Sequence, residues 1–306
     1  MLNYVLRRIP EALITLFLTS VVVFALSRMT GDPVALLLSE FATEEDRIIL
    51  TEQLGLDKPI LEQYVIFAGN ALRGDLGRSI RGERAPATDL LLERLPASLQ
   101  LAGISTLISF IIGVLTGVLS ATTRGTIIDV LLRIIALIGQ AAPVFWLGIV
   151  AMYFFSVQLG WLPTSGYGKP LQFVLPVFAL SSFMTAAVMR LTRAGMIEVI
   201  DSEFIKLARI KGLSEREVIW KHALRNSLIP VLTYVGTIFG RTISGAVIVE
   251  TIFAWPGVGR LAYEAVLARD FPVLQAVVLF TATSFLAINL LVDLLYAYID
   301  PRIRYS

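Results

Sequence analysis

Long apolar runs alternate with polar stretches along the chain, and this pattern is the first guide to its structure. Six runs are each near the ~20 residues that an α-helix needs to cross the hydrocarbon core of a bilayer. Backbone polar groups must pair with one another at that depth, which favours helices. The pattern therefore predicts an all-α membrane protein with six transmembrane helices, at Ile9–Leu26, Leu99–Ala121, Ile134–Val157, Phe173–Met189, Leu228–Val249 and Pro272–Ile299.

Positive charges in the polar stretches predict how the chain is oriented. The short loops on one side, together with both chain ends, hold 14 Lys and Arg residues, whereas the short loops on the other side hold three. Because Lys and Arg accumulate in cytoplasmic loops, we expect both termini in the cytoplasm. Arg7 and Arg8 before the first run also suit a signal peptide. No small-residue cleavage site follows, and the run is long enough to span, so we interpret it as a retained helix.

The stretch Thr30–Pro96 is the largest polar segment, and we expect it outside the cytoplasm. Its pattern predicts short helices joined by turns, since Asp32 before Pro33 is typical of a helix start. Twelve acidic and seven basic residues give it an acidic outer face. Such a face is either a plain cover over the helix bundle or a docking surface for a soluble protein, and the residues leave both open.

A second polar segment, Glu203–Pro230, interrupts the apolar pattern on the expected cytoplasmic side. Gly212 can adopt the left-handed conformation that closes a helix. Ser214, with Glu217 three residues later, has the spacing of a capping box, which starts another helix. The segment therefore predicts two short helices joined by a sharp turn. Such a unit is either an ordinary amphipathic loop or a docking element for a soluble partner.

Short motifs along the whole chain carry a family resemblance. They are Tyr4 with Arg7 and Arg8, Gly31-Asp32-Pro33, Gln53-Leu54-Gly55-Leu56-Asp57, Gly74-Asp75-Leu76-Gly77, Gly160-Trp161-Leu162-Pro163, Ala208-Arg209, Lys211-Gly212-Leu213, His222-Ala223-Leu224-Arg225-Asn226, Ile229-Pro230, Trp255-Pro256-Gly257-Val258-Gly259-Arg260 and Asp300-Pro301-Arg302. With these motifs the chain resembles the permease subunits of ABC importers, in the branch that carries dipeptides, oligopeptides and nickel. The Glu-Ala-Ala of the broader importer consensus is replaced here by Lys206-Leu207-Ala208, a departure that the branch shares.

The resemblance implies a type I ABC importer permease fold in a bacterial inner membrane. It implies a second homologous permease, two subunits that bind ATP and Mg, and an extracytoplasmic substrate-binding protein as partners. We expect a division into 1–29 with the first transmembrane helix, 30–96 as the extracytoplasmic helical segment, and 97–306 as a five-helix permease core. The ATPase-coupling loop lies within 193–229, and its expected residues are Glu203, Ala208, Arg209, Lys211, Gly212, Leu213, Ser214 and Glu217.

Composition supports a membrane protein and removes several other classes. Apolar residues make up 56% of the chain and charged residues 16%, and the formal charge of +2 is too small to suggest nucleic acid. There is no cysteine, and His222 is the only histidine, which excludes a histidine metal cluster and a catalytic triad with a second histidine. No phosphate-binding Gly-x4-Gly-Lys-Ser/Thr loop is present. We therefore expect no enzyme activity and no cofactor in this chain, and an ATPase in another subunit.

Two polar residues inside apolar runs are candidates for the translocation path. Arg241 lies near the middle of the fifth run, where an unpaired charge would cost at least ~2.5–3.5 kcal/mol. It should therefore face a cavity or a partner, as a cation on the substrate path or as half of an ion pair with an acid on the partner permease. The alternative is that the fifth span is drawn too deep and Arg241 lies outside the hydrocarbon. Gln140 in the third run raises the same question more weakly, as do Asn289 and Asp293 in the sixth.

Other transport classes fit the residues less well. Thr164-Ser165-Gly166-Tyr167-Gly168 superficially resembles a potassium filter, but only about six residues precede it after the third run, too few for a pore helix. A secondary transporter needs intramembrane acids or broken helices in matched halves, and only Asp293 is a plausible buried acid. We expect di- or oligopeptides as the substrate of an ABC importer, with glutathione or chelated nickel as alternatives.

Overall fold

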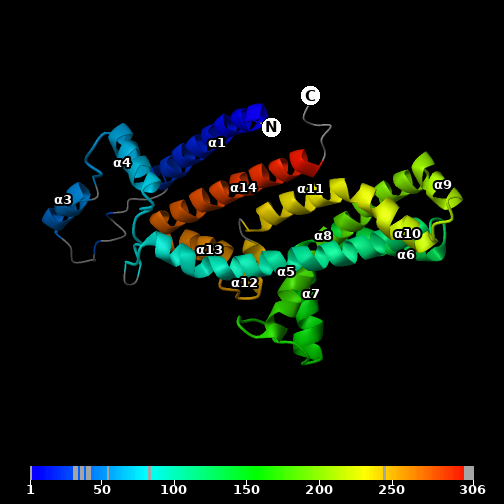
Figure 1. Ribbon diagram of the computed structural model, residues 1–306. Helices are drawn as coiled ribbons and strands as arrows, with labels where there is room; N and C mark the ends of the chain where they lie inside the picture. The colour runs from blue at the N-terminus through cyan, green and yellow to red at the C-terminus, as the bar shows by residue number, and fades with distance from the viewer. Residues whose placement is uncertain are drawn as a thin grey trace.

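The computed structural model describes residues 2–29, 34, 38, 43–53, 55–81, 84–243 and 246–299. Every long regular element in these ranges is a helix (Figure 1). The helices are α1 (Leu2–Met29), α3 (Glu44–Gln53), α4 (Ile60–Leu72), α5 (Ala87–Thr122), α6 (Ile127–Ala141), α7 (Val144–Met152), η1 (Tyr153–Gln158), α8 (Pro170–Ile200), α9 (Glu203–Ile210), α10 (Glu215–Glu217), η2 (Val218–Ala223), α11 (Leu224–Ile243), α12 (Val247–Ile252), α13 (Val258–Ala268) and α14 (Phe271–Ile299).

Five long helices, α1, α5, α8, α11 and α14, run along the long axis of the molecule (Figure 1). The pairs that pack together include α5 with α8, α11 with both α8 and α14, and α1 with α14. The short helices α3 and α4 lie at one end of this bundle, and α9 and α10 lie at the other. The two polar segments that interrupt the apolar pattern are therefore separated by the length of the bundle.

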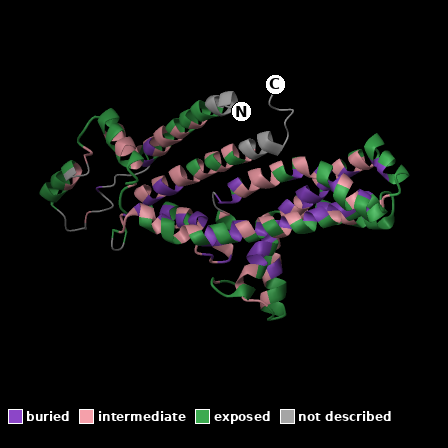
Figure 2. Cartoon of the chain, in the orientation of Figure 1, coloured by how far each residue is buried: buried purple, intermediate pink, exposed green. Residues whose placement is uncertain are grey.

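Small residues bring α5 and α8 into close contact. A Cβ added to Gly113 would lie 2.6 Å from Cβ of Val188, and one added to Gly117 would lie 2.6 Å from Cβ of Thr192. Glycine at such contacts lets helix backbones approach where hydrocarbon offers no hydrophobic drive for association. Figure 2 shows buried residues gathered where the long helices meet.

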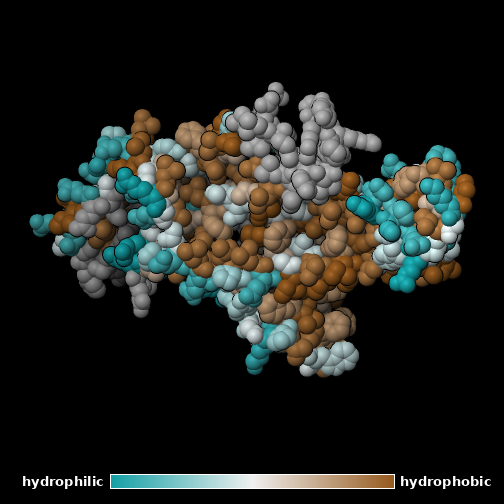
Figure 3. Space-filling view, in the orientation of Figure 1, coloured by the Kyte–Doolittle hydropathy of each residue, from teal (hydrophilic) through white to brown (hydrophobic). Residues whose placement is uncertain are grey.

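The outer faces of the bundle are apolar rather than polar. Leu13 of α1 is 60% exposed, and Leu107 of α5 is 58% exposed. In Figure 3 hydrophobic residues cover the middle of the molecule, while hydrophilic residues gather toward the two ends. A bundle with an apolar girdle and polar ends is the arrangement that a lipid bilayer requires.

Four of the six expected spans are confirmed as long apolar helices. They are the ones in α1, α5, α8 and α14, each long and apolar enough to cross a membrane. The helices exceed the expected ranges. α5 begins at Ala87 and continues through Pro96, although Leu99 was the expected start, and α8 continues to Ile200, although Met189 was the expected end.

The expected third span, Ile134–Val157, is wrong as a single straight helix. The structure has α6 and the α7–η1 helix instead, bent by 101° at a break before Pro143. Ala142 is extended there, with φ −73° and ψ 129°. Proline disfavours the helical conformation in the residue that precedes it, which accounts for the break. In Figure 1 α7 projects away from the bundle.

The expected fifth span, Leu228–Val249, is also not one helix. Residues 244–245 lie outside the described part, and Ala246, with φ −77° and ψ 57°, separates α11 from the short helix α12, which begins at Val247. Within the described ranges α11 is not among the helices apolar enough to span, since polar residues including Arg241 lower its mean hydropathy. Four described helices pass this test, or five spans if the bent pair counts as one, so the expected number of six is not confirmed.

Candidate coupling loop and the turn on the opposite side

The segment after α8 forms the helix–turn–helix that its sequence predicts. Gly212 has φ +80°, the left-handed conformation, and its N–H donates to the Arg209 carbonyl oxygen at 2.9 Å. Ser214 then caps α10: its Oγ accepts from the N–H of Glu217 at 3.3 Å. The Glu217 carboxylate lies 3.4 Å from the N–H of Ser214, which completes the capping box. The local signals are confirmed, and we call Glu203–Ala223 the coupling segment from here on.

An ion pair joins the two sides of this turn. The Arg209 Nε lies 2.7 Å from Oε1 of Glu215. The hydrogen bond that Arg209 donates to this carboxylate raises the pKa of the guanidinium above its usual value. Both side chains are exposed, so the pair adds little stability. It connects α9 to α10 across the turn at Gly212.

One face of the coupling segment is fixed to the bundle. Ile205 and Ala208 on α9 are buried together with Val218 and Ala223 of η2 and with Met196 of α8. Ala208 therefore belongs to the buried face that packs the segment against the bundle. This buried cluster packs the segment directly against α8.

The other face of the coupling segment is open. Leu207 is 56% exposed and Ile210 is 79% exposed, and Glu203, Lys211 and Gly212 are also exposed. Leu213 is half-buried. Exposed aliphatic side chains within a polar end of the molecule, visible in Figure 3, are typical of a surface that another protein covers. This face is the part of the segment that can dock.

The candidate path residues lie on different helices. Arg241 is exposed in the last turn of α11, and Gln140 is half-buried next to the end of α6. No hydrogen bond or ion pair joins these two among the described residues. The side chains of Asp293 and of Tyr4 and Arg7 fall outside the described part, as do residues 300–306.

A buried turn between α12 and α13 carries the Trp-Pro-Gly motif. Trp255 is fully buried, and its Nε1 donates to the Ala97 carbonyl oxygen of α5 at 2.9 Å. Tyr167 and Phe173 meet its ring edge-on, with centroids 4.9 and 4.6 Å away. Edge-to-face contacts of this kind stabilise aromatic clusters beyond their buried area. The turn is therefore docked on α5 and on the start of α8.

Glu250 holds the same turn from inside, and the sequence analysis did not single it out. It is 1% exposed, accepts a hydrogen bond from Ser98 Oγ at 2.8 Å and another from the Arg260 N–H at 2.9 Å. Burial raises the pKa of this carboxyl, and the bonds from Ser98 and the backbone oppose that rise. A Cβ on Gly257 would fall 2.4 Å from the carboxylate, so the turn requires glycine there. Glu250 directly follows the apolar run that ends at Val249, and an acid in that position was the sequence signal that could have identified it.

The described residues offer no group of three or more His, Cys, Asp or Glu side chains that could hold a metal ion. Buried carboxylates in these ranges, such as Glu250, instead accept hydrogen bonds from other parts of the chain. The geometry is that of a membrane bundle with a buried turn between α12 and α13 and, after α8, a segment with one open face.

Comparison with known families decides the class of the protein. Residues 113–305 match the family described as the binding-protein-dependent transport system inner membrane component, and residues 1–102 match the N-terminal part of such components. The chain belongs to this family. It is therefore a permease subunit of a binding-protein-dependent ABC importer in a bacterial inner membrane, as the motifs predicted.

Relatives and solved structures agree with this assignment. The chain is 40% identical to the glutathione transport system permease protein GsiC of Escherichia coli strain K12 and to that of Shigella dysenteriae, over the full length of each. An inward-facing structure of the MetNI methionine ABC transporter is 19% identical, with a TM-score of 0.58 over 69% of this chain and 96% of that chain. A crystal structure of an amino acid ABC transporter with histidines has a TM-score of 0.50 at 20% identity, over 70% and 94% of the two chains. These two structures support the permease fold.

Proposed function

We propose that this permease imports small peptides and that glutathione is the first substrate to test. The observation that supports this choice is the identity of 40%, over the full length of both chains, to permeases named for glutathione transport. Glutathione is itself a tripeptide, so it falls within the peptide class that the motifs indicate. Dipeptides and longer oligopeptides are the next candidates, and a chelated nickel ion follows them.

The proposed complex contains a second, similar permease, two ATPase subunits and an extracytoplasmic binding protein. ATP and Mg are bound by the ATPase subunits, since this chain has no phosphate-binding loop. The path lies between the two permeases, and Arg241 and Gln140 are its candidate lining residues in this chain. The segment 30–96 is the proposed contact surface for the binding protein, and the division at residues 29 and 96 is part of the same proposal.

Coupling runs through the open face of the coupling segment. Lys211, Gly212 and the exposed Leu207 and Ile210 would occupy a groove on an ATPase subunit. Closure of the two ATPases on ATP displaces the segment, and its buried face transmits the displacement to α8. The two permease bundles then rock about the central path, which is alternating access.

Co-purification tests the composition of the complex. The tagged chain is extracted in mild detergent, and the bound proteins are identified by mass spectrometry. The expected result is a second permease with two ATPase subunits. A clean homo-oligomer, together with uptake that an ion gradient drives, would contradict the proposal and favour a secondary transporter.

Uptake by a strain lacking peptide and glutathione importers tests the substrate. The strain is complemented with the whole transport system, and labelled glutathione is compared with a labelled dipeptide. Glutathione uptake that vanishes when an ATPase subunit is inactivated is the expected result. Uptake of the dipeptide alone would overturn the choice of glutathione and leave the importer assignment intact.

A further inference from the structure

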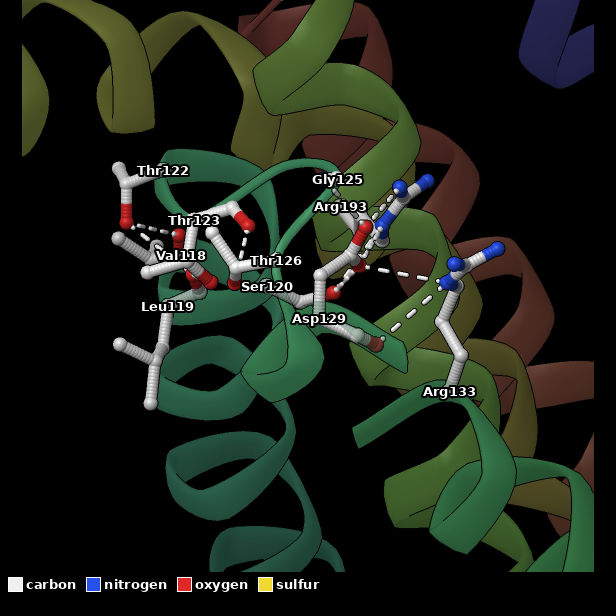
Figure 4. A network of polar contacts seen from close by, with 10 residues as sticks. All are labelled: Val118, Leu119, Ser120, Thr122, Thr123, Gly125, Thr126, Asp129, Arg133 and Arg193. Carbon is white, nitrogen blue, oxygen red and sulfur yellow. Dashed lines mark hydrogen bonds and ion pairs between the residues drawn. The ribbon is translucent and has the colours of Figure 1, made fainter. Parts of the chain in front are cut away.

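Three helices meet around one buried carboxylate, at the end of the bundle that carries the coupling segment (Figure 4). The carboxylate belongs to Asp129, which is 1% exposed in the first turn of α6. Arg193 of α8 binds it through two donors on one edge of its guanidinium group. Nε lies 2.9 Å from Oδ1, and Nη2 lies 2.9 Å from Oδ2. This two-point contact fixes direction as well as distance.

Two further donors attach the same carboxylate to α5 and to the turn after it. Ser120 of α5 donates from Oγ to Oδ1 of Asp129 at 2.6 Å. The N–H of Gly125, in the turn between α5 and α6, donates to Oδ2 at 3.2 Å. Arg193 Nε also lies 3.0 Å from Ser120 Oγ. One carboxylate therefore joins α5, the turn, α6 and α8.

Arg133 contacts the same carboxylate without joining two helices. Its Nε lies 3.3 Å from Oδ1 of Asp129, and it sits one helical turn further along α6. Its side chain is 49% exposed, compared with 21% for Arg193. The network thus contains one arginine that bridges α6 to α8 and one that stays within α6.

The bridge lies close to the coupling segment along α8. Arg193 is eight residues before Asp201, the C-cap of α8, which corresponds to about 12 Å of helix. Ser202 then begins α9. A second contact ties the same turn to the end of α8, because Arg124 Nη1 lies 3.6 Å from Oδ2 of Asp201. Both of those side chains are largely exposed, and a surface pair of that kind holds weakly.

A buried ion pair adds little stability compared with well-packed apolar residues, and its value lies in geometry. The neighbouring contact between α5 and α8 is made of small and apolar groups, among them Gly117 against Thr192. Such a contact opposes movement of the two helices apart more than movement of one helix along the other. The Asp129–Arg193 pair adds the directional constraint that the apolar contact lacks. The pair lies near the end of α8 that leads into the coupling segment.

We propose that Asp129 and Arg193 are positioning residues for transport, which fasten the α5–α6 hairpin to α8 so that the three helices move as one body when the coupling segment is displaced. The inference rests on the proposed coupling role of that segment. Without the pair, α8 would move relative to α6, and ATP hydrolysis would continue with less substrate carried per cycle.

A distance measurement tests the rigid connection. The chain has no cysteine, so spin labels at Ile127→Cys on α6 and Leu171→Cys on α8 are unique within it, and neither position lies in the coupling segment. Both side chains are largely exposed, at 77% and 57%. Pulsed electron paramagnetic resonance then gives their separation in the whole importer, with the cysteines of the other subunits replaced, before and after trapping with ATP and vanadate.

The separation should stay constant within about 2 Å, the size of ordinary helix shifts, when Arg193 is present. In Arg193→Lys, which keeps the charge and loses the two-point contact, the separation should change between the two states. Arg133→Lys is the matched control and should behave like the parent. A change in the parent, or no change in Arg193→Lys, would overturn the inference.

Transport stoichiometry gives a readout that a purely structural role would not move. Uptake of labelled glutathione and ATP hydrolysis are measured on the same proteoliposomes that contain the whole importer. The uptake per ATP should fall about tenfold in Arg193→Lys, within the range of couplings measured along such networks, and stay at the parent value in Arg133→Lys. An equal loss of uptake and hydrolysis, with the ratio unchanged, would show that the pair only stabilises the fold and would overturn the inference.

Two more variants cover the cases in which Arg193→Lys alone does not give a clear result. If the Arg193→Lys complex does not assemble, the apolar double variant Asp129→Leu with Arg193→Met removes the pair without leaving a lone buried charge, and the same two measurements apply. Gly212→Pro in the coupling segment separates this inference from the proposed function. Coupled transport that survives Gly212→Pro contradicts the coupling role itself, whereas loss there with a normal ratio in Arg193→Lys contradicts only the role of the pair.

Discussion

Substitutions at Gly212 test the coupling segment most directly. Gly212 has φ +80°, and an added Cβ would meet no atom within 4 Å, so alanine costs backbone strain alone. For an L-residue in the left-handed region this strain is about 1–2 kcal/mol. Buried Ile205 and Ala208 and the Arg209–Glu215 pair hold the turn from both sides. Gly212→Ala should therefore keep the turn at reduced stability, and Gly212→Asn should be milder, since asparagine tolerates this region.

Proline at the same position cannot be accommodated. Its ring holds φ near −65°, about 145° from the value at Gly212, and it removes the N–H that bonds the Arg209 carbonyl. The turn must then reorganise, and α9 and α10 lose their fixed angle. We expect Gly212→Pro to reach the membrane and to lose the ATP hydrolysis that binding protein and substrate stimulate. The assay is stimulated hydrolysis in proteoliposomes, normalised to the permease by immunoblot.

The test compares stimulated ATP hydrolysis among the three variants. Stimulated hydrolysis should decrease from Gly212→Asn through Gly212→Ala to Gly212→Pro, with equal amounts of assembled complex. Normal stimulated hydrolysis in Gly212→Pro would refute the coupling assignment. A loss in Gly212→Ala as complete as that in Gly212→Pro would show that the strain estimate, or the support from the buried face, is wrong.

Three other substitutions probe packing, the buried turn and the capping box. Gly117→Leu places its Cβ 2.6 Å from Cβ of Thr192, so α5 and α8 must separate. Thermal unfolding in detergent should show a free energy of unfolding lower by about 1–3 kcal/mol. Unchanged unfolding would contradict the close contact. Glu250→Ala leaves the hydroxyl of Ser98 and a backbone N–H buried without an acceptor, at a cost of about 1–3 kcal/mol by the same measurement, whereas Glu250→Gln should cost less because it keeps a carbonyl acceptor. Ser214→Ala removes an N-cap worth about 0.5–2 kcal/mol and should speed hydrogen exchange in α10, with exchange in α8 as the unaffected control.

Much of the architecture could be predicted because its causes are local in the sequence. The apolar runs that became α1, α5, α8 and α14 carry their own signal in length and hydropathy. Gly212 and the capping box of Ser214 with Glu217 also act within a few residues, and the turn has the geometry that their spacing predicts. Docking of this segment on an ATPase is a property of the complex and stays a prediction.

The errors arose where a run of apolar residues hid a break. Average hydropathy across 134–157 takes no account of Pro143, although that proline sets the extended conformation of Ala142 and the 101° bend. The fifth run likewise continues in hydropathy past Ile243, where α11 ends. Hydropathy indicates whether a segment is surrounded by lipid or by water. It does not indicate whether the segment is one continuous helix, which depends on local backbone conformation.

The polar contacts that organise the bundle could not be read from the sequence for a different reason. Asp129 and Arg193 are 64 positions apart, and Ser98 and Glu250 are 152 apart. No spacing rule connects residues on separate helices, so Arg193 counted only as one of the positive charges that set orientation. A single sequence without the packing of α5 against α6 and α8 gives no reason to pair them.

The π-helical stretch η2, at Val218–Ala223, changes how members of the family should be aligned. A turn closed by i→i+5 hydrogen bonds holds one residue more than an α-helical turn. Two permeases that differ by one residue between the left-handed glycine and the start of α11 can therefore present the same face of α11 to α8 and α14. Counting positions from Gly212 to Pro230 then pairs residues of the two permeases that are not structurally equivalent. A gap placed inside Val218–Ala223 keeps the residues before and after it in structural register.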